Sequence, residues 1–259
     1  MFALAHLSDL HLRGDAGATE RVRVVRDHLA GLLHQVDAVL ITGDVTDAGD
    51  PADYAAAVEL FAGLGAHLPV LFCPGNHDER TAFRRGLLGA DGAGAGAGAG
   101  PVNQAYEIGG VDLLLLDSSV PGDPSGELAD ATLEWLERQL SASDRPALLA
   151  LHHPPAPLGM PALDAIRLRS PERLEAVVRA HDRVAAVLCG HAHTAAATTF
   201  AGRPLRAAPG VTSTVLLPWE VGDRYATSTE LPPALAFHLL DDGVLTTHYR
   251  ALALPPARG

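Results

Sequence analysis

Short apolar runs alternate along the chain with segments in which apolar residues recur every three or four positions. The runs are rich in β-forming residues and predict buried strands, whereas the recurring pattern predicts helices with one apolar face. Strands are predicted at residues 2–7, 36–42, 69–73, 146–151 and 184–189, and helices at 19–36, from Asp50-Pro51 onward, at 130–141 and from Ser170-Pro171 onward. This alternation is typical of a mixed α/β domain.

Cap and turn residues mark several boundaries in this pattern. Thr19 is the predicted N-cap of the first helix, and Asp50 is the predicted N-cap of the second, with Pro51 at its first position. Two hairpins are also predicted, one around Gly109-Gly110 between 104–109 and 111–117, and one that turns at 241–243.

The length of the chain suits one large domain. Its 259 residues show no shift of composition that would mark a boundary. We therefore expect a single domain over 1–259, in which 195–259 form a β-rich extension. The glycine–alanine repeat at 89–100 cannot offset its ordering entropy, so we expect a mobile loop there, as a tolerated insertion or a lid.

Charge and composition exclude several classes of protein. The formal net charge of −12 disfavours an extended nucleic acid as partner, because such binding needs basic residues that neutralise phosphates. No apolar run approaches the ~20 residues that cross a bilayer, and the N-terminus lacks the basic start of a signal peptide, so we expect a cytoplasmic protein. Cys73 and Cys189 each close an apolar run, which favours packing over a disulfide scaffold or metal ligation.

Side chains that commonly bind metals follow five of the predicted strands. In chain order they are Asp9 and His11, Asp44, Asn76-His77-Asp78, His152-His153, and finally His191 and His193. The carboxyl ends of strands form the ligand-binding edge of α/β sheets. Carboxylates and imidazoles crowded at this edge would repel one another or lose hydration without a cation. The pattern therefore predicts a metal site built from oxygen and imidazole donors.

The number of candidate ligands predicts two ions rather than one. The candidates are Asp9, His11, Asp44, Asn76, His152, His191 and His193. Seven side chains exceed what a single four-coordinate ion takes, and they suit two ions if one carboxylate bridges. A pair of cations ~3.5–4 Å apart is the usual arrangement for displacement at phosphorus.

These motifs resemble those of the calcineurin-like metallophosphoesterase superfamily. The sequence contains "SDLH" (8–11), "GDVTD" (43–47), "GNHD" (75–78), "HHPP" (152–155) and "GHAH" (190–193), in the family's order over roughly residues 3–200. The compact size, the proline-rich loop after "HHPP" and "LCGHAH" are most similar to bacterial class III cyclic-nucleotide phosphodiesterases. Similar loops also serve glycerophosphodiesterases and broad-specificity phosphodiesterases.

The resemblance implies a fold and a ligand set. The fold would be a four-layer α/β/β/α sandwich of two mixed sheets. Asp9, His11, Asp44 and His193 would hold one ion, and Asp44, Asn76, His152 and His191 the other, with Asp44 bridging. The ions would be divalent or trivalent, as Mn, Fe, Zn or Co. If "GHAH" is extended, its two histidines share a side and both face the site.

The resemblance also implies a reaction and its catalytic residues. A hydroxide generated between the metals would attack the phosphorus of a small diester. The leading candidate for this diester is a 3′,5′-cyclic nucleotide. His77 would protonate or stabilise the leaving oxygen, with Asp78 orienting it, or His77 would only hydrogen-bond a ligand. His153 and Asp47 are expected to orient ligands, Asp117 to orient a ligand or cap the structure, and the loop 154–161 to shape specificity.

Other readings stay open at this stage. The substrate is a glycerophosphodiester in one alternative and a phosphate monoester in another, and a non-catalytic interaction module on the same fold is a third. The apolar tail is compatible with a homodimer.

Overall fold

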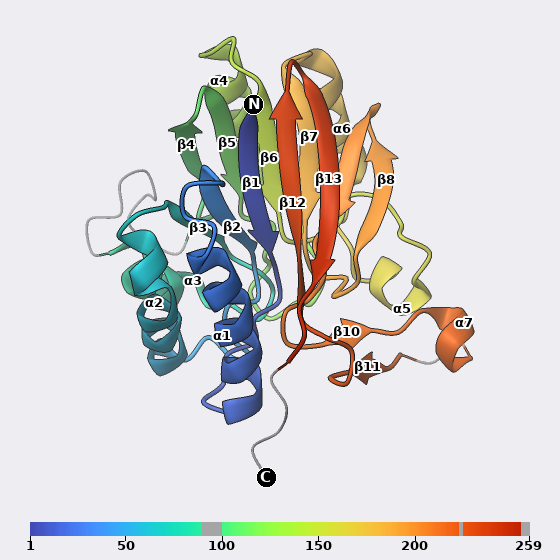
Figure 1. Cartoon of the computed structure of the whole chain (residues 1–259). Helices are drawn as coiled ribbons and strands as arrows, with labels where there is room; N and C mark the ends of the chain where they lie inside the picture. Colours follow the sequence, from blue (N-terminus) through green and yellow to red (C-terminus); the bar gives the residue numbers. More distant parts are fainter. Residues whose placement is uncertain (90–99, 223–224, 255–259) are drawn as a thin grey trace.

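Two mixed β-sheets form the centre of the protein. The structure is a computed structural model and describes residues 1–89, 100–222 and 225–254 (Figure 1). The first sheet has the order β13 (Val244–Ala251), β12 (Ala234–Asp241), β1 (Phe2–Leu7), β2 (Ala38–Thr42) and β3 (Val70–Cys73). Strands β1, β2 and β3 are parallel, and β12 and β13 are antiparallel to their neighbours.

The second sheet repeats this arrangement with six strands. Its order is β4 (Gln104–Ile108), β5 (Val111–Leu116), β6 (Ala147–Leu151), β7 (Val184–Cys189), β9 (Arg203–Ala207) and β8 (Ala196–Phe200). The four central strands are parallel, and β4 and β8 are antiparallel edge strands. The strands that precede the candidate ligands therefore lie in the parallel parts of both sheets.

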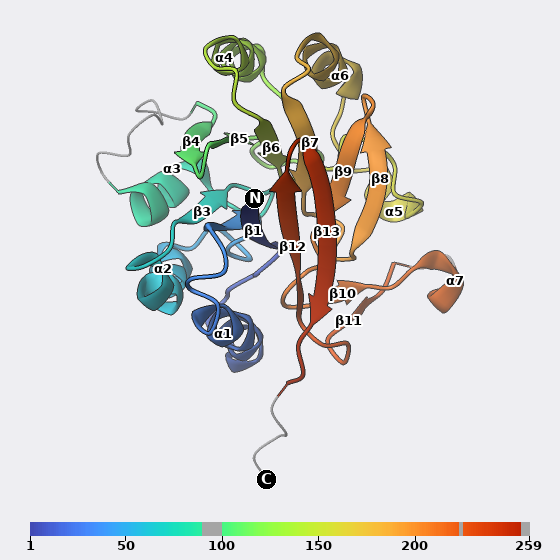
Figure 2. The ribbon, with the colours of Figure 1, turned by 45° about the horizontal axis from the view of Figure 1, so that its top comes forward.

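Helices cover the outer face of each sheet, as Figure 2 shows. Helices α1 (Ala16–Ala30) and α2 (Pro51–Gly65) pack on the first sheet, and α4 (Asp130–Ser141) and α6 (Pro171–Ala180) pack on the second. A third apolar layer lies between the sheets, where Leu4 and Leu40 meet Leu113 and Leu148. The four-layer α/β/β/α sandwich is thus confirmed.

Several short elements were not predicted. They are α3 (Arg80–Phe83) with the π-helical turn η1 (Arg84–Leu88), α5 (Pro161–Asp164), β10 (Thr214–Val215), α7 (Pro218–Val221) and β11 (Thr227–Ser228). Segments of two to five residues are too short to show a hydrophobic period.

The first helix differs most from its prediction. It begins at Ala16 rather than after Thr19, because the Asp15 carboxylate accepts a hydrogen bond from the backbone N–H of Ala18 at 2.7 Å and caps the helix. It ends at Ala30, so the predicted end at residue 36 was also wrong. Val36 still packs against the core, but from the loop after the helix.

The tail adds strands to both sheets. Strands β8 and β9 extend the second sheet, and the hairpin β12–β13 extends the first. Both predicted hairpins are confirmed, and the pairs Gly109-Gly110 and Asp242-Gly243 have the positive φ angles that tight hairpin turns require. The single domain over 1–259 stays a prediction. The loop predicted at 89–100 lies largely outside the described residues.

Within the ranges that the structure describes, no helix is long and apolar enough to cross a membrane.

A buried histidine pair joins β1 to β12. The Nδ1 of His6 lies 3.0 Å from the Nε2 of His238, and both side chains are fully buried. Threonine hydroxyls of Thr42 and Thr247 contact the outer nitrogens at 2.8 and 2.9 Å. Burial and then the neighbouring His238 hold the pKa of His6 well below its usual value, and burial and then Arg206 lower the pKa of His238 to about 3.

This pair should make the protein less stable as the pH falls below about 6.5. In that range these histidines bind protons in the unfolded chain but stay neutral in the folded chain. Each of them therefore lowers the unfolding free energy by about 1.4 kcal/mol per pH unit. Urea denaturation of metal-free protein at several pH values measures the slope. The slope gives the number of protons taken up on unfolding, and this number should fall by about one in His238→Gln. It should not fall in His67→Gln, a variant at an exposed position. Equal slopes in wild type and His238→Gln would contradict this account.

Candidate metal centre

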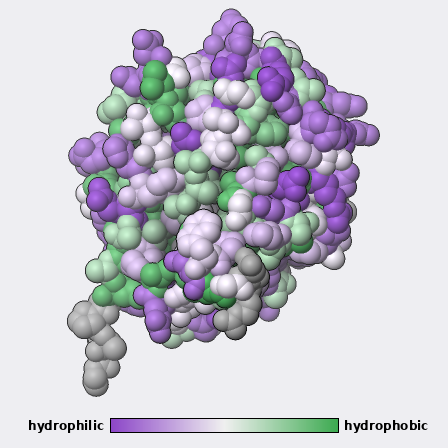
Figure 3. Space-filling model, turned by 90° about the vertical axis from the view of Figure 1, so that its right-hand side faces the viewer, coloured by the Kyte–Doolittle hydropathy of each residue, from purple (hydrophilic) through white to green (hydrophobic). Residues whose placement is uncertain are grey.

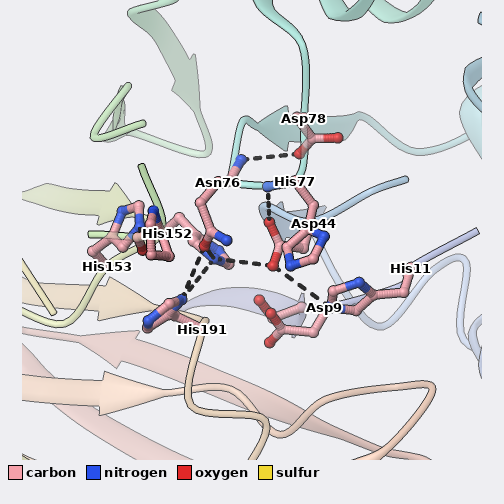
Figure 4. A network of polar contacts seen from close by, with 12 residues as sticks. Asp9, His11, Asp44, Asn76, His77, Asp78, His152, His153 and His191 are labelled. Atoms are coloured by element: carbon pink, nitrogen blue, oxygen red, sulfur yellow. Dashed lines mark hydrogen bonds and ion pairs between the residues drawn. The ribbon is translucent and has the colours of Figure 1, made fainter. Parts of the chain in front are cut away.

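The seven candidate ligands lie together at the carboxyl ends of five parallel strands. They follow β1, β2, β3, β6 and β7, and Figure 4 shows most of them facing one space. Asp9 and His152 have no exposed surface, and Asp44 is only 2% exposed. The five loops therefore bring the predicted side chains into one buried cluster.

The first half of the cluster contains Asp9, His11, Asp44 and His193. One donor atom from each lies within 4.8 Å of the others. The Nε2 atoms of His11 and His193 are 3.1 Å apart. His11 Nε2 lies 3.5 Å from Asp44 Oδ2, and His193 Nε2 lies 3.5 Å from Asp9 Oδ1. Two imidazoles and two carboxylates thus surround one point.

The second half contains Asn76, His152 and His191. The Oδ1 of Asn76 lies 3.1 Å from His152 Nε2 and 3.1 Å from His191 Nδ1. The two histidine nitrogens are 3.2 Å apart. His152 Nε2 also lies 3.3 Å from Asp44 Oδ2, the same oxygen that faces His11. Asp44 Oδ2 therefore lies between the two halves (Figure 4).

The other oxygen of Asp44 is fixed by the backbone. Oδ1 accepts a hydrogen bond from the N–H of His77 at 2.9 Å, which leaves Oδ2 turned toward both halves. Burial alone would raise the pKa of Asp44, but His152 and His11 hold it well below its usual value. Burial would lower the pKa of His152, but Asp44 raises it to about 9. Asp44 is therefore a buried anion.

Two buried oxygen atoms indicate that a cation fits this space. In the part of the chain that the structure describes, neither carboxylate oxygen of Asp9 has a hydrogen-bond partner. Buried polar atoms are nearly always paired, and an unpaired buried carboxylate is especially costly. The donors are oxygen and imidazole nitrogen, a set that Mn, Fe, Zn and Co all accept.

Three of the candidate histidine ligands have a partner at their second ring nitrogen. His11 Nδ1 contacts Asp47 Oδ1 at 2.9 Å, and His152 Nδ1 contacts the carbonyl of Thr42 at 2.7 Å. His193 Nδ1 contacts Ser213 Oγ at 3.0 Å. Such contacts set the tautomer and orientation of metal-binding histidines. The expected position of Asp47 beside a ligand agrees with this geometry.

The backbone at the cluster is strained. Among the described residues, eight other than glycine have a positive φ, and five of these are candidate ligands: Asp9, His11, Asp44, His191 and His193. Residues held in this region commonly mark functional sites. The expectation that "GHAH" is extended was wrong, because His191 and His193 have φ angles of 66° and 51°. The turn directs one imidazole to each half.

A donor atom of His153 lies within 4.8 Å of donor atoms of His152 and His191, but both of its ring nitrogens have other partners. Its Nδ1 contacts Ser118 Oγ at 2.8 Å, and its Nε2 contacts the carbonyl of Pro124 at 3.2 Å. Both ring nitrogens are thus engaged, and burial together with His152 lowers its pKa well below the usual value. Asp117 bonds Arg80, at 2.7 Å, and the backbone N–H of Val102, which is a structural role.

His77 and Asp78 occupy different surroundings. The side chain of His77 is 41% exposed, and its Nδ1 lies 2.8 Å from the carbonyl of Asp47. Asp78 accepts hydrogen bonds from Gly75 N and from the hydroxyl of Tyr54, at 2.9 and 3.0 Å, and burial raises its pKa to about 6. Its carboxylate braces the loops of Asp44 and Asn76 rather than the His77 ring.

Two pockets border the cluster. The larger, of about 670 Å³, is lined by His11, His77 and His193, together with Arg13 and Tyr225. The smaller, of about 380 Å³, is lined by Asn76 and also by His77. The loop 154–161, expected to shape specificity, lines neither of these two pockets, and its Met160 packs in the outer core.

Sequence reasoning missed the contribution of residues 208–215. Thr212 Oγ1 donates to the carbonyl of Asp9 at 3.0 Å, and Ser213 contacts His193 as described above. A Cβ on Gly210 would lie 3.0 Å from the His193 ring, so the chain approaches closely here. Small and hydroxyl residues carry no metal-binding signal, so the sequence offered little to find them by.

Comparison with known proteins agrees with this geometry. The sequence model of the calcineurin-like phosphoesterase family matches residues 2–195. The chain belongs to this family. A probable cyclic nucleotide phosphodiesterase of Rhodococcus erythropolis is 38% identical over 228 residues, which cover 85% of this chain and 74% of that protein. A glycerophosphodiester phosphodiesterase of Enterobacter lignolyticus is 35% identical over 217 residues, which cover 76% and 73%.

Solved structures share the fold of this calcineurin-like phosphoesterase. A dimetal phosphatase from Danio rerio superposes with a TM-score of 0.68 at 16% identity, over 97% of this chain and 99% of that one. A purple acid phosphatase from yellow lupin gives 0.69 at 12% identity, over 96% and 51%.

Substitution of Gly75 should abolish metal binding. A Cβ there would lie 2.2 Å from Asp44 Oδ1, so Gly75→Ala must displace the shared carboxylate. Elemental analysis after reconstitution and dialysis should find far less metal in this variant than in wild type. Gly63→Ala is the matched control, because no atom lies within 4 Å of its added Cβ and alanine favours the helix. Full metal content in Gly75→Ala would contradict the geometry.

Proposed function

We propose that this protein is a metal-dependent phosphodiesterase that hydrolyses a small phosphodiester, with a 3′,5′-cyclic nucleotide as the leading candidate substrate. The observation that carries the proposal is the position of Asp44 Oδ2, 3.5 Å from His11 and 3.3 Å from His152, between two groups of metal-type donors. The relatives named as cyclic nucleotide phosphodiesterases support the choice of substrate.

Two cations fit the donors available. Asp9, His11, Asp44 and His193 would hold one, and Asp44, Asn76, His152 and His191 the other. When bound, such ions lower the pKa of water so that hydroxide exists at neutral pH, and they stabilise charge on phosphoryl oxygens. Among the seven proposed donors, Asp9 and Asp44 are the two that carry negative charge. Two divalent cations would therefore leave the centre positive and suited to an anionic diester.

His77 is the proposed general acid. Its Nδ1 is held by the carbonyl of Asp47, which fixes the ring and leaves Nε2 for the substrate. The ring lines both pockets and packs edge-on against His11 at 4.7 Å. In its protonated form it can donate a proton to the oxygen that leaves phosphorus. Asp78 supports this role only indirectly, by bracing the loop that carries His77.

The pockets disfavour a long polyanion. Asp15, Glu20 and Asp47 line the larger pocket, and Arg13 there is paired with Asp15 and Asp47. Negative charge at the walls would repel further phosphates along a nucleic acid. A small diester with uncharged substituents avoids this repulsion.

A glycerophosphodiester is the second candidate. His77 lines both the larger and the smaller pocket, and a linear diester has two substituents to place. The relative from Enterobacter lignolyticus bears the name of such an enzyme. A cyclic nucleotide presents a single nucleoside and requires only one pocket.

A cytoplasmic location, a single domain and a homodimer remain predictions from the sequence. The face in Figure 3 mixes hydrophilic and hydrophobic residues.

Loss of a ligand should abolish diester hydrolysis. Asp44→Asn and Asn76→Ala should each lower kcat/KM by more than about 100-fold, because even residues that only orient ligands contribute 10- to 100-fold. Manganese-reconstituted protein is assayed on bis(p-nitrophenyl) phosphate, p-nitrophenyl phosphate and cyclic AMP. Metal binding without turnover would favour the interaction module, and faster monoester turnover would overturn the substrate class.

The role of His77 predicts a dependence on the leaving group. His77→Gln should lower kcat by about 100- to 10,000-fold on a diester with an alkoxide leaving group, the range typical of general acids. The loss should be much smaller with p-nitrophenolate, which leaves without a proton. His181→Gln, whose ring pairs with Glu137 on the outer helices, is the control. Equal losses on both substrates would show that His77 does not act as an acid.

A further inference from the structure

Arg21 lies on the buried face of α1, where the pattern of the helix calls for an apolar residue. Ala18, Val22, Val25 and Leu29 are its buried neighbours, and Arg21 itself is only 4% exposed. No ion pair joins Arg21 to a carboxylate in the part of the chain that the structure describes. A buried guanidinium is costly unless its donors are satisfied, so the position calls for a specific explanation.

The guanidinium donates to three backbone carbonyls of one segment. Nε donates to Val211 at 2.9 Å, Nη1 to Thr229 at 2.8 Å, and Nη2 to Leu231 at 2.7 Å. All three belong to the connection between β9 and β12, residues 208–233, which we name the connecting segment. Arg21 thus holds the beginning and the end of this segment to the same point of α1.

The connecting segment contacts the metal centre near its beginning. Val211 N donates to the carbonyl of Ser8 at 3.0 Å, and Thr212 Oγ1 donates to the carbonyl of Asp9. Ser213 Oγ contacts the outer nitrogen of His193. The residue that Arg21 holds, Val211, is therefore two positions from the residue that orients a ligand.

The same segment also forms a wall of the larger pocket. Tyr225 and Thr227 line that pocket, as does Arg21 itself. In Figure 1 the short strands β10 and β11 of the segment lie beyond the lower end of the two sheets, and α7 projects from them. Strands β10 and β11 pair over only two residues each, and Arg21 adds three hydrogen bonds that tie residues near both ends of the segment to α1.

We propose that Arg21 is a positioning residue of the metal centre, which holds the connecting segment so that Ser213 orients His193 and the pocket wall faces the substrate. The effect on substrate rests on the proposed function, whereas the effect on metal binding does not. Arginine suits the role because its planar fork reaches three separate carbonyls, which the point charge of lysine does less well.

The test compares Arg21→Met and Arg21→Lys with wild type. Arg23→Met is the matched control, because Arg23 lies on the same helix, is exposed and, among the described residues, pairs only with Glu20. Calorimetric titration of metal-free protein with Mn²⁺ should show one of two affinities weakened by about 10- to 100-fold in Arg21→Met, the size expected when a ligand loses its orienting contact. Arg21→Lys should restore part of this loss, and Arg23→Met should resemble wild type.

Two further readouts follow the connecting segment itself. Limited proteolysis of Arg21→Met should cut within 208–233 faster than in wild type. On a diester, its KM should rise because the pocket wall moves, and excess Mn²⁺ should restore kcat but not KM. A purely structural role would lower the melting temperature without changing the affinity for Mn²⁺ in protein that is still folded.

A second variant keeps the proposal testable if Arg21→Met does not fold. Ser213→Ala leaves α1 intact and removes the hydroxyl contact to His193 Nδ1, while the backbone carbonyl of residue 213 stays 3.3 Å from that nitrogen. It should therefore weaken one Mn²⁺ affinity by a smaller factor than Arg21→Met does. Wild-type affinity in folded Arg21→Met, or in Ser213→Ala, would overturn the proposal. Wild type that binds two ions but hydrolyses no diester would instead contradict the proposed function.

Discussion

The position of one carboxylate oxygen, Asp44 Oδ2, determines the arrangement of the rest of the site. It lies between a histidine of each half of the cluster, while Oδ1 is tied to the N–H of His77. A buried anion in this place requires compensating positive charge, which protonated His152, with its pKa raised to about 9, supplies when no metal is bound. Two cations that share this oxygen would meet that requirement, and the same pair would attract and activate a phosphodiester.

The fold contributes by placing five loops at a common edge. Strands from both sheets end beside one another, so short loops are enough to bring together candidate ligands that are distant in the sequence. The close approach has a steric condition, since a Cβ on Gly75 or Gly190 would collide with Asp44 or with Ser8. The left-handed backbone at five ligands is a second sign that the loops are held by their surroundings rather than by local preference.

Much of this arrangement could be predicted from the sequence, because its signals are local. Apolar runs mark the strands, and metal-type side chains stand directly after them, so Asp44 and His152 could be assigned to one site. The helix cap at Asp15 was missed because the first turn after it, Ala16-Gly17-Ala18, has no large apolar residue to show a helical period. The turn at His191 could not be predicted, since its backbone conformation is imposed by packing.

The connecting segment could not be predicted for a different reason. Thr212 and Ser213 are ordinary residues in sequence, and their role arises only when the tail returns to the end of β1. In the sequence, Arg21 looks like any polar residue on the surface of a helix. Its side chain nevertheless donates to the carbonyls of Val211 and Leu231, which are 190 and 210 positions away along the chain. Contacts of this range are a property of the folded chain.

The most direct test of this account is a crystal structure of manganese-loaded protein, with the ions located by anomalous scattering. The account predicts two peaks about 3.5–4 Å apart, one on each side of Asp44 Oδ2. The first should lie among Asp9, His11 and His193, and the second among Asn76, His152 and His191. A single peak, or two peaks that do not share Asp44, would contradict it.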